Sequence, residues 1–257
     1  MLNKENFFHF QLSCRHTVID SVGWTLRCGK DERRPIVLAC LNPHSFVTAQ
    51  RDRKFTDALY SADHLVCDGI GVKVVGNILL GSKIERFTGP DMFEAIMRQA
   101  ELIGAVRVFF IGGSLDALTG ILERVKIDFP NVVCGGYSPP YKEEFSKADN
   151  EAILEKVAEF APDIVWVGLS APKQEKWVAE NLDRINCKVI SSIGAVFDFY
   201  SGTIKRAPTL LRFLGLEWFW RSILDPKRLG KRNLISNPRF LYESVKAFLQ
   251  RNKDKSV

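Results

Sequence analysis

Short apolar segments alternate, over the first 200 residues, with longer segments whose apolar residues recur every three or four positions. Short runs rich in Val and Ile are typical of buried parallel strands. Six such runs occur: Ile36–Leu41, His64–Cys67, Val106–Ile111, Val132–Gly135, Ile164–Gly168 and Lys188–Ile193. The segments between them have helical spacing. This alternation predicts an α/β fold with a doubly wound, mostly parallel sheet.

The rhythm changes after Phe199. Three prolines, Pro208, Pro226 and Pro238, divide the rest of the chain into three short segments, each beginning at or near a proline. Helices often begin in this way, and none of the three segments has the pattern of a strand. We therefore expect a body over residues 1–204 and a helical appendage over residues 205–257.

Charge separates the same two parts. The 257 residues carry a net charge of +6, but residues 205–257 hold 13 Lys and Arg against 4 Asp and Glu, a net of +9, so the body sums to −3. In the appendage, Trp218, Phe219 and Trp220 lie among leucines and arginines. This mixture suits an anionic membrane surface or an oligomer interface, and fits nucleic acid less well.

Metal and redox chemistry find little support in the sequence. The six cysteines form no C-x-x-C pair, the four histidines lack metal-ligand spacing, and no Asp-x-Asp occurs. We expect no metal and no cofactor. No signal peptide is evident, and no apolar run approaches the roughly 20 residues that a spanning helix needs. These features predict a cytoplasmic protein that is at most peripheral to a membrane.

The candidate chemistry lies where strands end, because open α/β sheets bind ligands at the carboxyl ends of their strands. Asp68 follows one strand directly; it is a candidate general base or, alternatively, the N-cap of a helix starting near Ile70. Gly112 and Gly113 end another strand, and they form either a seat for an anion or a tight turn with Ser114 as the next N-cap.

Other candidate residues are weaker. Asp198 lies in an apolar segment, where it either binds sugar hydroxyls or pairs with Lys205 or Arg206. Cys67 is better explained as a buried strand-end residue than as a nucleophile. A dinucleotide fingerprint beginning at Gly69 fails because Val74 stands at its third glycine position, and Gly76 to Gly81 lacks the Lys that a P-loop requires.

Several segments, taken in order, resemble the WecG/TagA/CpsF family of glycosyltransferases. They span about residues 36 to 235 and are Asn42, Asp68–Gly71, Glu85-Arg86, Gly89–Asp91, Gly112-Gly113, Ala171–Trp177, Gly194-Ala195, Phe197-Asp198, Gly202–Pro208 and Gly215–Trp218, continuing to Arg221, Pro226 and Arg228. Each segment alone is weak evidence for the family, whereas the whole set in this order is specific to it.

The resemblance implies a Rossmann-like body with a basic appendage that docks on the cytoplasmic face of the plasma membrane. It implies an inverting, metal-independent transfer of a sugar, most often N-acetylmannosamine, from a UDP-sugar to a polyprenyl-diphosphate-linked sugar in surface polysaccharide synthesis. Cys40 stands where the family commonly has Thr, and Ser192-Ile193-Gly194 where Gly-Val-Gly is usual. A member that uses UDP-glucose for exopolysaccharide is therefore the alternative.

The resemblance also assigns roles to residues. Asp68 is expected to be the general base. The donor and acceptor pocket is expected to contain Asn42, Arg86, Asp91, Gly112, Gly113, Gln174, Gly194 and Asp198. Contacts with the lipid diphosphate are expected from Arg206, Arg221, Arg228 and Lys231. A nicotinamide-dependent oxidoreductase and a nucleic-acid-binding module are more distant alternatives, and a homo-oligomer is possible.

Overall fold

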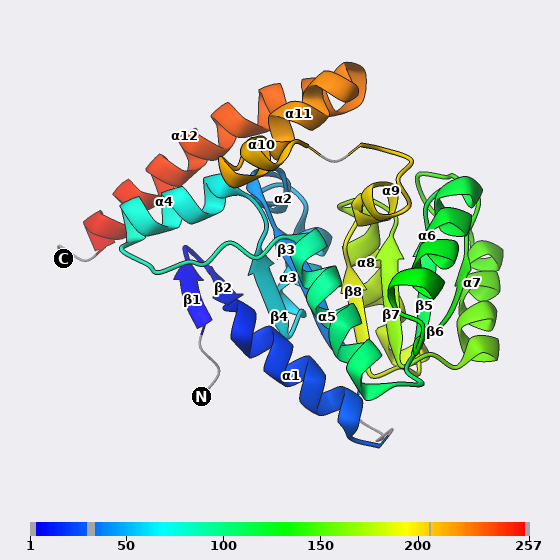
Figure 1. Ribbon diagram of the computed structural model, residues 1–257. Coiled ribbons are helices and arrows are strands. Elements are labelled where there is room, and N and C mark those ends of the chain that lie inside the picture. The colour runs from blue at the N-terminus through cyan, green and yellow to red at the C-terminus, as the bar shows by residue number, and fades with distance from the viewer. Residues whose placement is uncertain (1–3, 30–33, 206, 255–257) are drawn as a thin grey trace.

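A computed structural model describes residues 4–29, 34–205 and 207–254, without the side chains of residues 212, 213, 228, 231 and 251–254. In these residues eight strands form one sheet, in the order β1-β2-β4-β3-β8-β7-β5-β6 (Figure 1). All neighbouring strands are parallel except β1 and β2. The strands are β1 Lys4–Phe7, β2 Phe10–Ser13, β3 Ile36–Leu41, β4 His64–Cys67, β5 Arg107–Gly112, β6 Val133–Tyr137, β7 Ile164–Gly168 and β8 Val189–Ser192.

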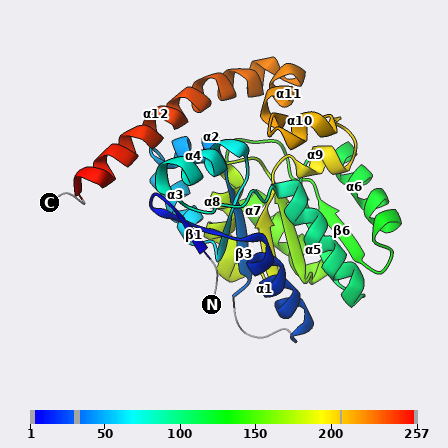
Figure 2. The same ribbon diagram turned by 60° about the vertical axis from the view of Figure 1, so that its left-hand side comes forward.

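Helices cover both faces of the sheet (Figures 1 and 2). One face packs against α1 (Arg15–Arg27), α5 (Gly89–Ile103), α6 (Leu115–Asp128) and α9 (Val196–Tyr200). The other face packs against α2 (Pro43–Ala49), α3 (Arg53–Tyr60), α7 (Lys147–Phe160) and α8 (Lys173–Asn181), which continues into the short 3₁₀ helix Leu182–Arg184. The predicted doubly wound α/β fold is confirmed.

The six predicted strands are all present. β3, β4 and β7 have the predicted bounds, whereas β5, β6 and β8 differ by one or two residues at their ends. The β1–β2 hairpin was not predicted. Each of its strands has only four residues, and the inward-facing side chains of β2, Phe10 and Leu12, give a single period of alternation around exposed Gln11.

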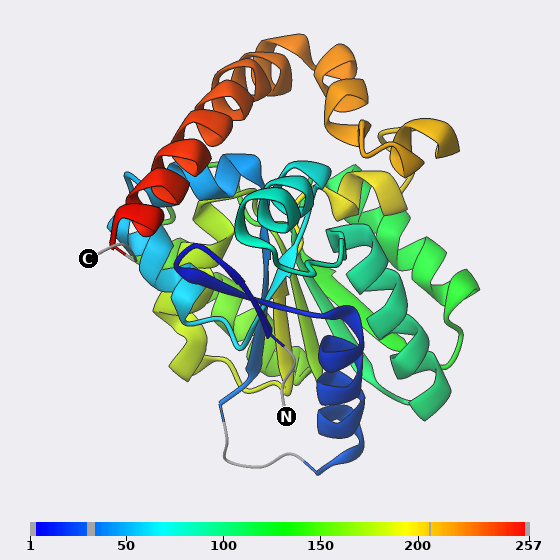
Figure 3. The same ribbon diagram turned by 90° about the vertical axis from the view of Figure 1, so that its left-hand side faces the viewer.

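The C-terminal helices lie across the carboxyl ends of the strands (Figures 1 and 3). They are α10 (Thr209–Phe213), α11 (Glu217–Leu224), a π-helical turn (Pro226–Gly230) and α12 (Lys231–Asp254), which runs beside α2 and α4 (Ile70–Leu80).

The prediction that a helix begins at or near Pro238 is wrong, because α12 begins at Lys231 and continues through Pro238. An interior proline costs a helix about 3 kcal/mol. Burial of one face of α12 offsets this cost. Phe240 packs there against Phe7 and Phe46, with ring centroids 6.2 and 5.5 Å apart, in line with buried Ser236 and Ser244.

Candidate active site

A cavity of about 1140 Å³ lies over the carboxyl ends of β4, β3, β8 and β7, with residues of α11 and α12 on its far wall. Seven of the predicted site residues line it. They are Asn42, Asp68, Arg86, Gln174, Gly194 and Asp198 from the body and Arg221 from α11. The fold therefore brings together, at one edge of the sheet, residues that lie almost 180 positions apart in the chain.

Asp68 is the first residue after β4. Its backbone N–H donates to the carbonyl of Leu41 on the neighbouring strand β3, at 2.9 Å, and so continues the parallel ladder by one residue. The next residue, Gly69, adopts a φ of +122° and is the N-cap of α4, a helix without a side-chain cap. The alternative that Asp68 caps this helix is therefore wrong, and its side chain lines the cavity instead.

Four charged side chains of the described residues act on the Asp68 carboxyl. Its pKa is raised from the ordinary value, chiefly by burial. Arg221 and Arg86 lower the pKa of Asp68, whereas Glu217 and Asp91 raise it. A carboxylate with a raised pKa is a stronger base than one in water, and this is the property that proton abstraction from a hydroxyl requires.

Asn42 follows β3 and faces the same cavity. Its Oδ1 accepts hydrogen bonds from the Ser45 backbone N–H at 2.9 Å and the Ser45 hydroxyl at 3.2 Å, so it caps α2. A carbon atom added at Gly69 would lie 3.9 Å from Cβ of Asn42, which places the ends of β3 and β4 in contact. The carbonyl end of the amide is used by the cap, and the NH₂ end is the part that can meet a ligand.

Three predicted pocket residues lie outside the lining of the cavity. Asp91 belongs to a capping box at the start of α5, where its Oδ2 accepts from the Thr88 backbone N–H at 3.2 Å and hydroxyl at 2.6 Å. Gly112 and Gly113 have φ values of +107° and +73°. A Cβ at Gly112 would lie 2.6 Å from the Gly168 carbonyl oxygen, so this turn is packed against β7. Ser114 caps α6, as the tight-turn alternative predicts.

The basic residues of the appendage are described unequally. Arg221 lines the cavity, with Cζ 5.3 Å from the ring centroid of Phe199. Arg206 lies outside the described residues. The backbone of Arg228 belongs to the π-helical turn and Lys231 is the first residue of α12, but their side chains also lie outside the description. Their predicted contacts with a lipid diphosphate remain predictions.

Comparison with known proteins matches the resemblance noted in the sequence. The model of the glycosyl transferase WecG/TagA/CpsF family matches residues 8–254. The chain belongs to this family. Among its relatives is the N-acetylglucosaminyldiphosphoundecaprenol N-acetyl-beta-D-mannosaminyltransferase of Bacillus subtilis, 31% identical over 222 residues, which are 84% of this chain and 81% of the relative. The protein of the same name from Staphylococcus aureus is 26% identical over 82% of this chain and 80% of its own length.

Some cavity residues of this WecG/TagA/CpsF family member were not predicted. His44 lies near Arg232, and its Nδ1 is 2.9 Å from the Ser236 hydroxyl on α12, so it joins the body to the appendage. Burial, aided by Arg232, lowers the pKa of His44 to about 4, which keeps its ring neutral near pH 7. The position of His44 two residues after Asn42 was a usable signal. No sequence signal marked Arg232, since only the packing of α12 on the body brings it to the cavity.

Glu175 was also missed as a site residue. In α8 the buried residues Gln174, Trp177, Val178 and Asn181 have helical spacing, which marks the inward face of this helix. Glu175 is buried beside this stripe and lines the cavity with Gln174. A glutamate in the first turn usually faces solvent, so the sequence pattern alone favoured an exposed side chain.

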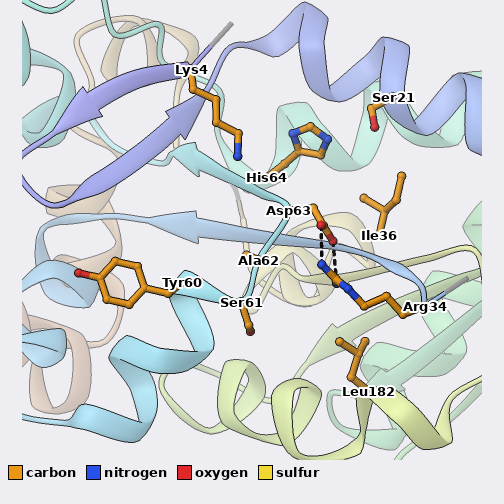
Figure 4. Close-up of a pocket in the computed structure, with 10 residues that line it drawn as sticks. All are labelled: Lys4, Ser21, Arg34, Ile36, Tyr60, Ser61, Ala62, Asp63, His64 and Leu182. Carbon is orange, nitrogen blue, oxygen red and sulfur yellow. Dashed lines mark hydrogen bonds and ion pairs between the residues drawn. The ribbon is translucent and has the colours of Figure 1, made fainter. Parts of the chain in front are cut away.

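A second, smaller hollow of about 550 Å³ lies at the opposite, amino-terminal edge of the sheet of this glycosyltransferase (Figure 4). Its charged residues include Arg34, which forms two hydrogen bonds of 3.0 and 2.7 Å to the Asp63 carboxylate. His64 is buried there, with Nδ1 3.0 Å from the Ser13 hydroxyl. No predicted site residue lines this hollow, so the cavity at the carboxyl edge is the candidate active site.

Metal-binding arrangements are absent from the part of the chain that the structure describes. There, no three His, Cys, Asp or Glu side chains are grouped so that they could hold a metal ion. Cys67 is 1% exposed, and burial raises the pKa of its thiol to about 12, which makes it unsuited to act as a thiolate nucleophile.

Proposed function

We propose that this glycosyltransferase moves N-acetylmannosamine, with inversion, from a UDP-linked donor to a sugar on a polyprenyl diphosphate. The observation that carries the proposal is Asp68, a carboxyl of raised pKa that lines the cavity within electrostatic reach of Arg86 and Arg221. The names of the relatives support the substrate class, since they specify an N-acetylmannosaminyl transfer to a lipid diphosphate sugar. Their β product requires inversion if the donor is α-linked.

In the proposed step, Asp68 accepts the proton of the acceptor hydroxyl. The hydroxyl oxygen forms a bond to C1 of the donor sugar from the face opposite UDP. The bond between C1 and the phosphate oxygen breaks, and its electron pair leaves with UDP. Asp68 then returns its proton to solvent. A general base of this kind contributes typically about 10²–10⁴-fold to a rate.

Arginines supply the stabilisation of the leaving group in this proposal. UDP gains negative charge as it departs, and the lipid diphosphate of the acceptor is also an anion. Arg86 comes from the body, and Arg221 and Arg232 come from the appendage, all lining the cavity. Guanidinium groups bind phosphate oxygens in pairs and keep their charge when buried. Charge stabilisation by such groups needs no metal ion.

A peripheral membrane site completes the proposal. On α12, Phe240, Ser236 and Ser244 are buried against the body, whereas Leu234 and Leu241 are exposed, Leu241 at the border of the cavity. Further apolar side chains are exposed on α11, α12 and α4, namely Trp218, Phe219, Ile223, Leu224, Ile235, Tyr242, Val245, Leu249, Val74 and Ile78. Apolar helix faces beside basic residues suit insertion among anionic headgroups. Across the described helices, none combines the length and the apolar character needed to cross a bilayer.

The test is a panel of UDP-sugars, including UDP-N-acetylmannosamine and UDP-glucose, offered with a synthetic polyprenyl-diphosphate-linked N-acetylglucosamine. Wild-type protein is expected to release UDP with UDP-N-acetylmannosamine, and Asp68→Asn to lose at least about 10²-fold of this rate while it folds normally. Asp20→Asn, at an exposed position on α1, is the matched control and should retain full activity.

Each result decides a separate part of the proposal. Release with UDP-glucose alone would replace the donor sugar and leave the step intact. An active Asp68→Asn variant would remove the general base. No release with any UDP-sugar would overturn the proposed function as a whole.

A further inference from the structure

Gln174 and Glu175, in the first turn of α8, form a buried polar pair on the wall of the cavity. They are 4% and 5% exposed, and both line the cavity. Gln174 Nε2 donates a hydrogen bond of 2.8 Å to Glu175 Oε1. Their other two side-chain oxygens, Gln174 Oε1 and Glu175 Oε2, are buried, and no described residue donates a hydrogen bond to either. Buried polar atoms are rarely left without a partner, so this pair needs an explanation.

No cation among the described side chains forms a salt bridge with the pair. Burial raises the pKa of Glu175 to about 7, and the two influences that lower it are hydrogen bonds from Gln174 and from its own backbone. A carboxyl kept in such a place without a cation is costly for folding. It also repels phosphate. The pair therefore disfavours a phosphate group and suits a ligand group that carries a hydrogen-bond donor, such as a hydroxyl or an amide N–H.

Glu175 determines which end of the Gln174 amide faces away from it. The amide turns its NH₂ group toward Glu175, where Nε2 donates to Oε1, and ionisation of Glu175 reinforces this direction because a carboxylate only accepts hydrogen bonds. The amide oxygen, Oε1, is then the end that is left to accept a hydrogen bond from elsewhere. Gly194 borders this amide: a Cβ at Gly194 would lie 3.6 Å from both Nε2 and Oε1. A side chain larger than hydrogen at that position would cover the amide.

The position of the pair indicates which part of the ligand it meets. Gln174 follows β7, and its amide borders Gly194, which follows β8. β8 pairs with β3, and β3 pairs with β4, the strand that ends before Asp68. Asp68 is the proposed base, and the sugar that reacts must lie next to it. The Gln174–Glu175 pair and the proposed base therefore line the same cavity from different strands, with room for the transferred hexose between them.

We propose that Glu175 is a positioning residue that orients Gln174, so that Oε1 of Gln174 accepts a hydrogen bond from a hydroxyl or amide N–H of the transferred hexose. This inference rests on the proposed function in one respect, that the donor is a UDP-sugar. It goes beyond that function because it assigns a role to Glu175 and fixes the polarity of the contact.

The test compares Glu175→Met and Glu175→Gln with the wild type. Methionine fills the space but accepts no hydrogen bond from the amide, so the KM for the UDP-sugar should rise about tenfold, equivalent to ~1.4 kcal/mol. Glutamine offers a carbonyl oxygen to the same NH₂ group and should restore the KM to within about threefold of wild type. Glu155→Gln, an exposed carboxyl on α7 that lies outside the lining of the cavity, is the control and should leave the KM unchanged.

Calorimetric titration with UDP alone separates the hexose from the nucleotide. Because UDP lacks the hexose, its affinity should be the same for wild type and Glu175→Met. An equal loss of affinity for UDP and for the UDP-sugar would place the contact on the nucleotide and overturn the inference. A fall in kcat at constant KM, or a Glu175→Gln variant as poor as Glu175→Met, would also overturn it. If wild-type protein binds no UDP-sugar, the proposed function fails first and the inference fails with it.

Discussion

At the scale of single residues, two buried carboxyls in one cavity have different chemistry. Asp68 has a raised pKa but lies among the charges of Arg86, Arg221, Glu217 and Asp91, so its charged form is partly compensated. Among the described residues, the influences that lower the pKa of Glu175 are hydrogen bonds from Gln174 and from its own backbone. The first environment suits a group that must gain and lose a proton during each turnover. The second suits a group that only holds its neighbour, Gln174, in place.

Glu175 should also make the stability of the protein depend on pH. Its pKa is about 7 when folded, above the ordinary 4.5. The stability that comes from this difference is complete below about pH 4.5 and is lost as the pH rises through about 7, because the unfolded chain ionises first. Between pH 4 and pH 8, the free energy of unfolding of the wild-type protein should therefore fall by about 3 kcal/mol more than that of Glu175→Gln.

Urea unfolding of both proteins at a series of pH values measures this difference directly. Glu155→Gln serves as the control, since it makes the same substitution at an exposed position on α7 and its pH profile should follow that of wild type. Parallel pH profiles for wild type and Glu175→Gln would show that Glu175 is ionised at little cost in the folded protein.

At the scale of helices and strands, the sequence predicts elements well where one period dominates. β3, β4 and β7 are runs of buried residues between turn signals, and their bounds are as predicted. The β1–β2 hairpin is too short for its alternation to stand out. Pro238 is a strong local signal that tertiary packing overrides, because Phe240 must reach the pocket formed by Phe7 and Phe46. Local patterns cannot report a contact between residues more than 200 positions apart.

The exposed apolar side of α12 gives a prediction at the scale of one helix. Leu234 is 78% exposed there, and Leu102 on α5 is 81% exposed on the body. If α12 inserts among headgroups, Leu234→Glu loses the burial of a leucine, typically about 1.5–3 kcal/mol, and adds repulsion from anionic lipid. Binding to phosphatidylglycerol vesicles, measured by co-sedimentation, should weaken at least about tenfold.

Leu102→Glu is the matched control for this prediction, because it introduces the same change at an equally exposed leucine of the body. Its vesicle binding should equal that of wild type. If Leu234→Glu binds vesicles normally but changes the oligomeric state in solution, the exposed side of α12 is an interface between copies of this chain.

At the scale of the whole molecule, the site depends on how the appendage sits on the body. Asn42, Asp68 and Gln174 could be predicted as neighbours because each follows a parallel strand. The presence of Arg221 beside them follows from no such rule. Gly215, at a φ of +72°, allows the chain before α11 to approach α4 so closely that a Cβ would lie 2.5 Å from Cβ of Ile70. Sequence periodicity contains no information on that contact, although the family resemblance does place Arg221 at the site.

The joining of these two parts can be measured through the pH dependence of transfer. Arg221 and Glu217 both come from α11 and act on the pKa of Asp68 in opposite directions. Without the Arg221 charge, Asp68 should hold its proton to a higher pH, so the acidic limb of kcat/KM for Arg221→Met should move to higher pH. Without the Glu217 charge, Asp68 should ionise more easily, and the limb for Glu217→Gln should move to lower pH.

The measurement of interest is the pH at which kcat/KM falls on the acidic side. The size of kcat/KM itself is not used, since Arg221 also meets a diphosphate in the proposed reaction. Arg239→Met changes a basic residue of α12 that lies outside the lining of the cavity and pairs with Glu243 at 3.6 Å. Its limb should coincide with that of wild type. Shifts of opposite sign in the two α11 variants would show that the appendage tunes the base of a cavity built by the body. Limbs that stay in place, or that move in the same direction, would show that Asp68 does not set the acidic limb.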